Sequence, residues 1–557
     1  MPKKLIFPIS CLLLTALLLS GLGSVQLFDW DEINFAAISR EMVVSGDWLR
    51  PTINFQDFYE KPPLFFWLQA TAMTLLGTGE YAARLPNALC GLLTFVLLYR
   101  LGRSRDTGSS GSLAWLWPLT YFGSILPLLY FQTGIIDPWF NLFTFLCIDQ
   151  LARPQRRAAV PLAGLYLGLA LLTKGPAAGL IVALCSAIIL LRQMPCWKKR
   201  RQASGLRWWQ PALAGVLALV LFSCWLLPDW IYRDGTFTHA FLEYQWRLFS
   251  KEDAGHGGFP GYHVVVLLVG CFPAGLLALP QLFRPTGPRS VYERWMAALF
   301  WVVLIVFSLV GTKIVHYSSL AYFPLSWLAA RQVQEWLEGK RTAKGGIVAA
   351  ILGVGGLWAA ASLLLPVLGR HTDWLLPLVK NDSFVTALLG LAVPWPVYTL
   401  LPGLFLTATL ILCYRRWRTG RNDWAVALCL GVGLYTFTAL YCFPNRILAY
   451  SQGSHVAFWQ RVGVLEQDKH ILVYGFRSYA PYFYAGIQPH QARADNGALL
   501  TQPIGWPQYI SCKIGDLEKL RTAQPEIREL YRSGGFVFCA RPAMGEPLPE
   551  LPPITGE

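Results

Sequence analysis

The sequence is short of charge: only 14% of its 557 residues are Asp, Glu, Lys or Arg, while 54% are hydrophobic. Soluble domains carry about 25% charged residues. This shortage excludes an ordinary soluble protein and predicts an integral membrane protein with many spans. The net charge of +15 does not indicate a nucleic-acid partner, because the basic residues fall in short clusters between apolar runs and not on one polar face.

Several motifs are also missing. The chain has no Walker-type phosphate loop, no Gly-x-Gly-x-x-Gly segment after an expected strand, and no internal repeat. It has no Cys-x-x-Cys spacing that would suggest a zinc site. Most of the twelve cysteines stand singly in apolar runs and are expected to be small core residues. Cys512 and Cys539 lie in the polar tail and could pair only in an oxidising compartment.

The basic clusters predict the topology. If the Lys and Arg excess marks the cytoplasmic side, the acidic stretches fall outside. The fold class is then a mostly α polytopic protein with ~13 spans, many near 20 residues and some shorter, starting inside and ending outside. The spans are expected at 5–27, 83–101, 112–131, 135–152, 159–174, 176–192, 211–230, 262–283, 295–311, 316–330, 346–368, 394–414 and 424–443.

Two domains are expected, divided after residue 444. Residues 1–444 form the transmembrane domain, with a first outer loop at 29–82 and a flexible outer loop at 231–261. The apolar run 62–78 is marginal for a span and is expected to be an interfacial helix of the first outer loop. Residues 445–557 carry no span and predict a small α/β domain outside the membrane, with strands at 471–476 and 534–541 and a helix at 515–533.

The densest group of charges lies between residues 28 and 68, directly after the first span. Carboxylates are costly at membrane depth, so this group should face water or line a cavity. We interpret it as the floor of an active site, with Glu32 and Arg40 lining a substrate cavity. The alternative is a loop whose charges are simply solvated. Residues 33–45 have apolar positions at roughly helical spacing and are expected to form an amphipathic helix on the membrane surface.

Two carboxylates are the candidate catalytic groups. Asp137 precedes Pro138 at the outer start of the fourth span, where Asp-Pro is also typical of a helix N-terminus. Asp31 is expected at the same depth and on the same side. Two carboxylates that converge on one cavity can position and deprotonate an acceptor.

Three single lysines stand at outer membrane boundaries, against the positive-inside trend: Lys61, Lys174 and Lys313. Each alone could be a snorkelling lysine. Together they favour a bound anion, and a lipid phosphate is the natural candidate because its headgroup sits at this depth. Tyr59 and Tyr317 could donate hydrogen bonds to the same anion, although tyrosine is routine at membrane interfaces.

The outer loop at 231–261 carries two further candidates. His256 lies in a Gly-rich stretch with Glu252 and Asp253, a composition typical of lids. It is a candidate metal ligand, although a lone loop histidine is usually just solvated. Arg247, earlier in the same loop, is expected to line the substrate cavity.

With these residues in view, the chain resembles the polytopic GT-C glycosyltransferases that use lipid-linked sugars. It is most similar to the aminoarabinose transferases that modify lipid A, and more distantly to the protein O-mannosyltransferases. The similar segments are 31–48, 58–63, 172–176 and 311–317, together with the Asp-Pro pair at 137–138. The similarity covers the membrane part from residue 31 to about residue 330.

The resemblance implies a sugar carried on polyprenyl (undecaprenyl) phosphate and transferred with inversion on the outer face of the bacterial inner membrane, without a nucleotide sugar. The implied acceptor is lipid A or a similar glycolipid. The implied partners also include the surrounding membrane lipids. It implies that Asp31 and Asp137 are needed for activity and that the three lysines line the donor phosphate. Asn34 departs from the pattern, because the lipid A enzymes tend to have arginine there.

The resemblance further implies a divalent metal, zinc, held in some members by the Glu of the Glu-Lys-Pro motif and by loop histidines. Glu60 and His256 match these positions, but Glu243-Tyr244 stands where a second histidine is expected.

The resulting hypothesis is electrostatic. The lysines stabilise the phosphate as it leaves the anomeric carbon, Asp31 orients the acceptor or acts as its base, and Asp137 supports the geometry or the positive charge on the sugar. Two alternatives stay open. One is a protein O-glycosyltransferase with a Ser or Thr acceptor. The other is a non-enzymatic lipid or sugar transporter, which predicts repeats and broken helices near the midplane.

Overall fold

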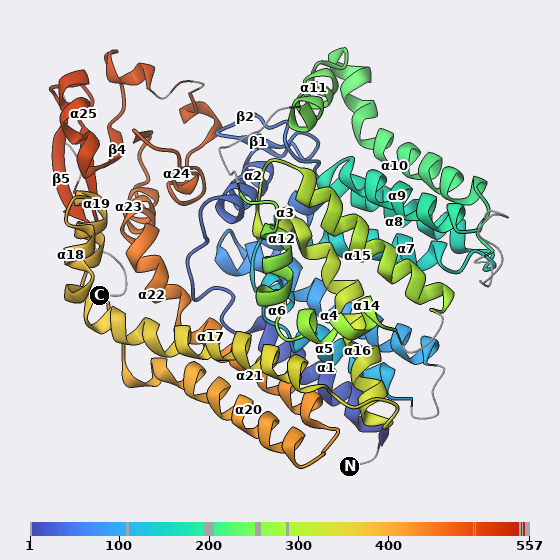
Figure 1. Ribbon diagram of the computed structural model, residues 1–557. Coiled ribbons are helices and arrows are strands. Elements are labelled where there is room, and N and C mark those ends of the chain that lie inside the picture. The colour runs from blue at the N-terminus through green and yellow to red at the C-terminus, as the bar shows by residue number, and fades with distance from the viewer. Residues whose placement is uncertain are drawn as a thin grey trace.

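The computed structural model describes residues 3–106, 111–193, 205–250, 258–285, 289–493, 495, 497–544, 547 and 550–551. The protein is mostly helical (Figure 1). A large body of packed helices makes up most of the molecule. A smaller part with a four-stranded sheet lies at one corner, at the upper left of Figure 1.

Six helices within the described ranges are long and apolar enough to cross a membrane. They are α4 (Glu80–Arg105), α10 (Trp209–Arg233), α15 (Val291–Leu309), α17 (Gly345–Arg370), α20 (Leu401–Arg418) extended by η6 (Val397–Leu400), and α21 (Trp424–Cys442). Two bent pairs raise the number to eight if each is one span. The first joins α5 (Leu113–Phe122) to α6 (Ile125–Leu129) and η1 (Tyr130–Gln132) at 82°. The second joins α12 (Tyr262–Val265) and η3 (Val266–Gly270) to α13 (Ala274–Leu277) and α14 (Leu279–Phe283) at 103°.

Shorter helices fill the remaining expected spans. They are α1 (Lys3–Leu19), α7 (Asp137–Leu151), α8 (Ala159–Lys174), α9 (Ala177–Leu191) and α16 (Tyr322–Leu337), the last preceded by η4 (Val315–Ala321). A helix or a bent helix pair therefore lies in each expected segment, while six to eight of those described are long and apolar enough to cross a membrane. Two glycines of α8 let this helix approach α10 closely. A Cβ atom added at Gly164 would lie 2.6 Å from Leu217, and one added at Gly168 would lie 2.7 Å from Leu221.

The first outer loop is ordered throughout. It contains α2 (Asp31–Ser45), the hairpin strands β1 (Thr52–Ile53) and β2 (Gln56–Asp57), and α3 (Leu64–Leu76). Helix α2 ends as predicted at Gly46, which has a φ of +74°. The hairpin turn holds Asn54 and Phe55 at φ of +53° and +54°, a conformation that normally favours glycine. The carboxylate of Glu41 accepts hydrogen bonds from both backbone N–H groups, at 2.7 and 2.8 Å, and holds this turn in place.

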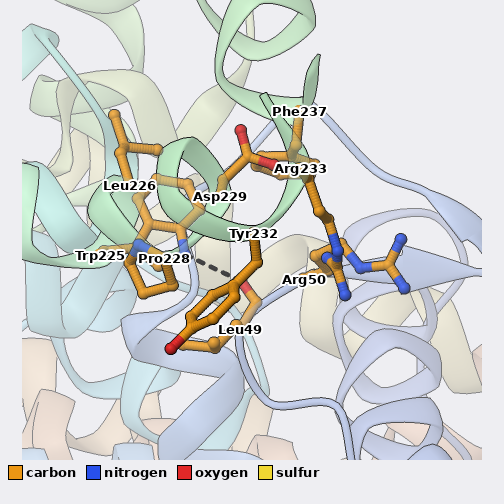
Figure 2. Close-up of a pocket in the computed structure, with 9 residues that line it drawn as sticks. All are labelled: Leu49, Arg50, Trp225, Leu226, Pro228, Asp229, Tyr232, Arg233 and Phe237. Atoms are coloured by element: carbon orange, nitrogen blue, oxygen red, sulfur yellow. Dashed lines mark hydrogen bonds between the residues drawn. The ribbon is translucent and has the colours of Figure 1, made fainter. Parts of the chain in front are cut away.

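The segment expected to be the first outer loop is fastened to the C-terminal end of α10. The indole N–H of Trp225 donates to the carbonyl of Leu49 at 2.9 Å, as Figure 2 shows. Asp47 pairs with Arg50 at 3.0 Å and with Arg233 at 3.6 Å. These contacts surround a small cavity of about 160 Å³. The following helix, α11 (Thr236–Ser250), occupies about half of the expected flexible loop at 231–261, and residues 251–257, with His256, lie outside the described ranges.

The C-terminal part forms an α/β unit. Helix α22 (Pro444–Leu448), η7 (Ala449–Gly453) and α23 (Ser454–Gly463) lead into a sheet in the order β3-β4-β6-β5. The strands are β3 (His470–Tyr474), β4 (Gln508–Lys513), β5 (Arg528–Ser533) and β6 (Phe536–Arg541), and only the β3–β4 pair is parallel. Cys512 and Cys539 are buried on neighbouring strands as free thiols.

One expected helix is wrong. The segment 515–533 is helical only in α25 (Leu517–Ala523) and η10 (Ile514–Asp516), and its second half is the strand β5. Strand β5 is the sheet edge and is mostly exposed, so its charged residues do not alternate with buried ones as in a half-buried strand.

The C-terminal unit covers α2, which corrects the expected surface helix. Eleven of its fifteen residues are buried, and in Figure 1 α2 lies between α3 and α24 (Ala480–Tyr484). The Arg40 guanidinium donates to the carbonyl of Ile487 at 2.9 Å. The Asp29 carboxylate accepts from the Ser478 hydroxyl and, at 3.3 Å, from the backbone N–H of Tyr479. Helix α2 is therefore packed at the interface between the helical body and the C-terminal unit, here named the seam, and does not lie on the membrane surface.

Candidate active site

A cavity of about 820 Å³ begins beside the first outer loop. One end is polar and contains Asp31, Glu32, Arg84, Lys313 and His316. The rest is lined mainly by apolar side chains of the broken helix α5–α6, α17 and α21, among them Leu126, Leu129, Trp358, Leu365, Ala439 and Phe443. The cavity thus combines a charged end with a long apolar wall.

His316 joins the two predicted catalytic carboxylates. Its Nε2 lies 3.5 Å from an Asp31 carboxylate oxygen and 3.9 Å from an Asp137 carboxylate oxygen. Asp31 is the first residue of α2, Asp137 is the first residue of α7, and His316 lies in η4. The Ser319 hydroxyl holds η4 in place, because it donates to the His316 carbonyl at 2.5 Å and accepts from Asn141 at 2.8 Å. The convergence expected for Asp31 and Asp137 is present.

Asp137 is neutralised by Lys174. Their ion pair measures 2.6 Å, and the Asp137 side chain is only 3% exposed. The alternative role of Asp137 as a helix cap does not apply, because Ile136 occupies the N-cap position of α7. The Lys174 ammonium also lies 5.2 Å from the ring centre of Tyr317, a cation–π arrangement. Lys174 and Tyr317 therefore belong to the same cluster as the two carboxylates.

Lys61 also reaches this cluster, from the Glu-Lys-Pro-Pro segment. It forms an ion pair with the adjacent Glu60. Burial disfavours the charged form of Lys61, but the Glu60 carboxylate and the nearby Asp31 outweigh it and raise the Lys61 pKa above its usual value. Gln245 of α11 fixes the segment by donating to the Glu60 carbonyl at 3.0 Å.

Lys313 lies at the cavity wall, but its side chain points back at the end of the preceding helix, α15. Its ammonium donates to the carbonyls of Phe307, Ser308 and Val310, the first two at 3.2 and 2.7 Å. These carbonyls are at the C-terminal end of α15, where a cation is favourable. Lys313 is therefore the one member of the lysine trio that no carboxylate neutralises among the described residues.

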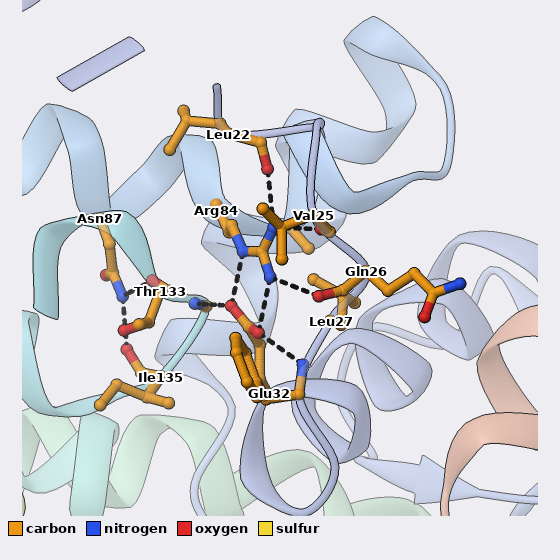
Figure 3. A network of polar contacts seen from close by, with 12 residues as sticks. Leu22, Val25, Gln26, Leu27, Glu32, Arg84, Asn87, Thr133 and Ile135 are labelled. Carbon is orange, nitrogen blue, oxygen red and sulfur yellow. Dashed lines mark hydrogen bonds and ion pairs between the residues drawn. The ribbon is translucent and has the colours of Figure 1, made fainter. Parts of the chain in front are cut away.

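Glu32 and Arg84 form a buried brace at the polar end of the cavity (Figure 3). Arg84 donates to both oxygens of Glu32, at 2.8 and 2.9 Å, and both side chains are 3% exposed. The same carboxylate accepts from the backbone N–H of Phe28 at 2.8 Å and of Gly134 at 2.5 Å. Arg84 also donates to the carbonyls of Leu22, Val25 and Gln26. Glu32 borders the cavity as predicted, with its hydrogen-bonding capacity already used.

Three predicted site residues lie apart from the cluster. The Tyr59 hydroxyl donates to Asp57 at 3.3 Å, and its ring contacts Phe237 of α11. Arg40 is in the seam with the C-terminal unit. Arg247 is exposed on α11, with its guanidinium 4.6 Å from the ring centre of Tyr244.

The predicted metal site receives no support from the described residues, in which no three His, Cys, Asp or Glu side chains gather to hold an ion. Glu60 is paired with Lys61, and His256 lies outside the described ranges. Metal binding stays a prediction.

His316 is the residue that sequence reasoning missed. His316 lies in the family-like segment 311–317, between Lys313 and Tyr317, but only these two neighbours were predicted to be site residues. A histidine at an outer membrane boundary, close in sequence to two site candidates, was the available signal.

Sequence comparison finds one family match and several named relatives. The family described as dolichyl-phosphate-mannose-protein mannosyltransferase matches residues 60–227. The chain is 28% identical over 397 residues to the undecaprenyl phosphate-alpha-4-amino-4-deoxy-L-arabinose arabinosyl transferase of Shewanella sediminis, covering 67% of this chain and 70% of that protein. It is 26% identical over 445 residues to the protein of the same name from Edwardsiella ictaluri, covering 76% and 74%.

Structure comparison identifies the fold. ArnT from Cupriavidus metallidurans bound to undecaprenyl phosphate superposes with a TM-score of 0.75 over 96% of this chain and 98% of that chain, at 18% identity. The apo structure of the same protein gives 0.72. The chain therefore has the fold of these ArnT structures, and the resemblance to lipid-linked-sugar glycosyltransferases that its motifs indicated is confirmed.

Proposed function

We propose that this protein is an inverting glycosyltransferase of the bacterial inner membrane. It moves an aminoarabinose-type sugar from undecaprenyl phosphate to lipid A on the outer face. The observation that carries the proposal is the cavity of about 820 Å³, whose charged end meets Asp31 and His316 and whose length is apolar. Such a shape suits a ligand that is a phosphate at one end and a long hydrocarbon at the other. The names of the two relatives supply the sugar and the lipid carrier.

The donor's hydrocarbon lies along the apolar wall formed by α6, α17 and α21. Trp358, Leu365 and Phe443 line this wall, and they offer a chain that arrives from the bilayer an apolar surface comparable to the lipid tails it leaves. The cavity opens beside lipid-exposed helices: only 28% of the apolar stretch of α17 is buried inside the protein. A polyprenyl chain can therefore enter sideways from the membrane.

The donor phosphate is attracted first by the positive charge of Lys313. Lys61 and Lys174 each have a carboxylate partner, whereas Lys313 contacts only carbonyls, which leaves its charge uncompensated. Its three N–H donors are used by those carbonyls, so Lys313 acts on the phosphate through its positive potential and not through a hydrogen bond. Lys61 and Lys174 supply further positive potential as the phosphate gains negative charge on leaving.

The sugar sits between this phosphate and the Asp31 carboxylate. The Asp31 side chain is one-third exposed and its nearest ionisable neighbour is His316 at 3.5 Å, so it is free to bind the sugar. Asp31 stabilises the positive charge that develops at the anomeric carbon. Asp137, held by Lys174, acts through His316 as a positioning residue.

The reaction is a single displacement. An oxygen of the acceptor forms a bond to the anomeric carbon from one face, while the bond from that carbon to the donor phosphate oxygen breaks on the other. The electron pair leaves with undecaprenyl phosphate. An acceptor phosphate is already an anion and needs no base, whereas an acceptor hydroxyl would lose its proton to Asp31.

We also propose the full topology on which this outer-face site depends. The chain crosses the membrane ~13 times, with spans as short as about 15 residues where helices are enclosed by their neighbours or the bilayer thins locally. The N-terminus is then inside, and the α/β unit at residues 445–557 is outside. Reporter fusions after residue 343, expected inside, and after residue 443, expected outside, check this arrangement.

The decisive experiment is transfer by the purified protein in nanodiscs. The donor is a synthetic undecaprenyl phosphate-aminoarabinose and the acceptor is lipid A, with products read by mass spectrometry. We expect modified lipid A from the unaltered protein and none from Asp31→Asn. Movement of labelled donor across the bilayer without a glycosidic product would instead identify a transporter.

A protein acceptor is the second candidate, because the matching family is named for protein mannosyltransferases. Mass spectrometry of lipid A and of secreted proteins, from cells with and without this protein, distinguishes the two. Sugar on Ser or Thr with unaltered lipid A would replace the lipid acceptor by a protein.

A further inference from the structure

A second large cavity, of about 780 Å³, lies at the end of the helical body away from the catalytic cluster. It is formed by the connection after α7, the start of α8 and the start of α10. Helix α8 runs from this cavity at Ala159 to the catalytic Lys174, a distance of roughly 24 Å at 1.5 Å per residue. In Figure 1, α7, α8, α9 and α10 lie together at the right of the molecule. The second cavity is therefore distinct from the donor cavity and borders the other leaflet.

The lining of this cavity is strongly basic. Arg156, Arg157 and Arg207 all border it and are exposed, and none of its described lining residues is acidic. The neighbouring arginines differ. Arg105 pairs with Asp149 at 2.9 Å, and Arg153 pairs with the same carboxylate. Asp149 is thus already engaged, and three positive charges at the cavity have no acidic partner among the described residues.

Hydrogen bonds between its lining segments fix the shape of this cavity. The Gln210 side chain, 7% exposed, donates to the carbonyl of Pro154 at 3.0 Å and accepts from the backbone N–H of Arg207 at 2.9 Å. Gln193 donates to the carbonyl of Leu206 at 3.3 Å. These hydrogen bonds tie the connection before α8 to the start of α10, so the three arginines are presented from two fixed segments.

An apolar wall continues from the arginines. Val160 and Pro161 of α8 and Leu213 and Leu217 of α10 line the same cavity. Leu213 and Leu217 are 43% and 38% exposed. Only 17% of the apolar stretch of α10 is buried inside the protein, so this wall faces lipid. A ligand held here meets cations at the membrane surface and hydrocarbon directly beneath.

We propose that this cavity is a binding site for an anionic phospholipid of the leaflet opposite the catalytic cluster. The headgroup phosphate binds Arg156, Arg157 and Arg207, and the acyl chains lie on Leu213 and Leu217. Basic pockets between membrane helices on the cytoplasmic side have the chemistry that binds anionic headgroups. The planar guanidinium of arginine can donate two parallel hydrogen bonds to two oxygens of one phosphate. The exposed leucines distinguish a lipid from a free phosphate, because a soluble anion gains nothing from them.

Native mass spectrometry of the full-length protein tests the assignment. The protein is equilibrated with cardiolipin, phosphatidylglycerol or phosphatidylethanolamine, and bound lipid is counted. We expect the two anionic lipids to be retained over phosphatidylethanolamine. We expect the triple variant Arg156→Ala/Arg157→Ala/Arg207→Ala to lose roughly 100-fold of their affinity or somewhat more, at about 1 kcal/mol for each basic residue.

A matched control removes three exposed cations from other predicted inside clusters: Lys344→Ala/Arg415→Ala/Arg418→Ala. This variant should keep the preference for anionic lipid. An equal loss in the control would show that only overall charge matters and would overturn the site.

A second variant, Leu213→Ser/Leu217→Ser, separates lipid from free phosphate. It should weaken cardiolipin binding, and pyrophosphate should compete poorly with bound cardiolipin. Tight pyrophosphate binding that the leucine changes leave unaltered would overturn the lipid in favour of a soluble anion. Unaltered lipid binding by a folded arginine triple variant would overturn the site altogether.

Discussion

Asp31 and Glu32 are neighbours in the sequence and begin the same helix, yet their surroundings differ completely. The Glu32 side chain is 3% exposed and accepts from Arg84 and from two backbone N–H groups. The Asp31 side chain is 33% exposed, borders the cavity, and has His316 at 3.5 Å. A carboxylate whose oxygens are all occupied holds a structure together. One with free oxygens at a cavity can bind a substrate. The comparison therefore assigns stability to Glu32 and chemistry to Asp31.

The largest expected effect is on activity at Asp31. Asp31→Asn keeps the size of the side chain but removes the negative charge that faces the sugar. We expect turnover to fall by about 10³-fold, the scale of losing one well-placed electrostatic group. The melting temperature should not change, because this side chain makes no buried ion pair. Initial rates of lipid A modification and thermal melting of the same sample check both parts.

The next effect is on stability at Glu32. Glu32→Gln leaves the Arg84 guanidinium buried without its countercharge, which costs about 3–5 kcal/mol. We expect a clear fall in melting temperature and in the yield of folded protein. Activity for each folded molecule should stay close to normal. A variant that melts normally and fails to transfer sugar would reverse the roles given to the two neighbours.

His316 tests whether the two carboxylates work as one unit. His316→Ala removes the ring between Asp31 and Asp137 and lets both side chains shift. We expect turnover to fall by about 10²-fold, because a displacement near 1 Å has this effect. The Michaelis constant for the donor should change much less. A rise in that constant with unaltered turnover would make His316 a binding residue.

Lys313 separates donor binding from chemistry. Lys313→Met removes the positive charge that we assign to attraction of the donor phosphate and should raise the Michaelis constant for the donor about 10-fold, the scale of one charge acting over about 10 Å. Lys380→Met removes one exposed outer cation away from the cavity and serves as the control. Equal effects of the two variants would contradict a specific role for Lys313.

The smallest expected effect is a pH dependence at the seam. Burial raises the pKa of Asp29 from 3.8 to about 6, against the opposing hydrogen bonds from Ser478 and Tyr479. The folded state therefore binds this proton more tightly than the unfolded state. The resulting stabilisation is complete below pH 3.8 and is lost as the pH rises through 6. Melting temperature should fall by about 1–3 °C across this window, and Asp29→Asn should flatten the profile.

The sequence was enough to locate most helices. Long apolar runs such as 346–368 and 424–443 gave α17 and α21, because hydropathy depends on local composition. The two carboxylates were also found from their position at outer span ends. What composition could not reveal is contact between distant segments. The burial of α2 depends on Ile487 and other residues more than 400 positions away.

The lysines show the same limit. Lys61, Lys174 and Lys313 looked equivalent, because each is a single cation at an outer boundary. Their partners make them different: two are neutralised by carboxylates, and Lys313 lies three residues past Val310, the last of the carbonyls that it contacts at the end of α15. That short spacing was a signal for helix capping. The pairing of Lys174 with Asp137 could not be predicted from the sequence, since 37 residues separate them.

The most direct test of the account is the ratio of transfer activity to folded protein, measured for the two neighbours in one experiment. Folded protein is counted by size-exclusion fluorescence, and activity by mass spectrometry of lipid A. We predict a ratio at least about 100-fold below normal for Asp31→Asn and a ratio near normal for Glu32→Gln, despite its low yield. Equal ratios for the two variants, or a normal ratio for Asp31→Asn, would contradict the account.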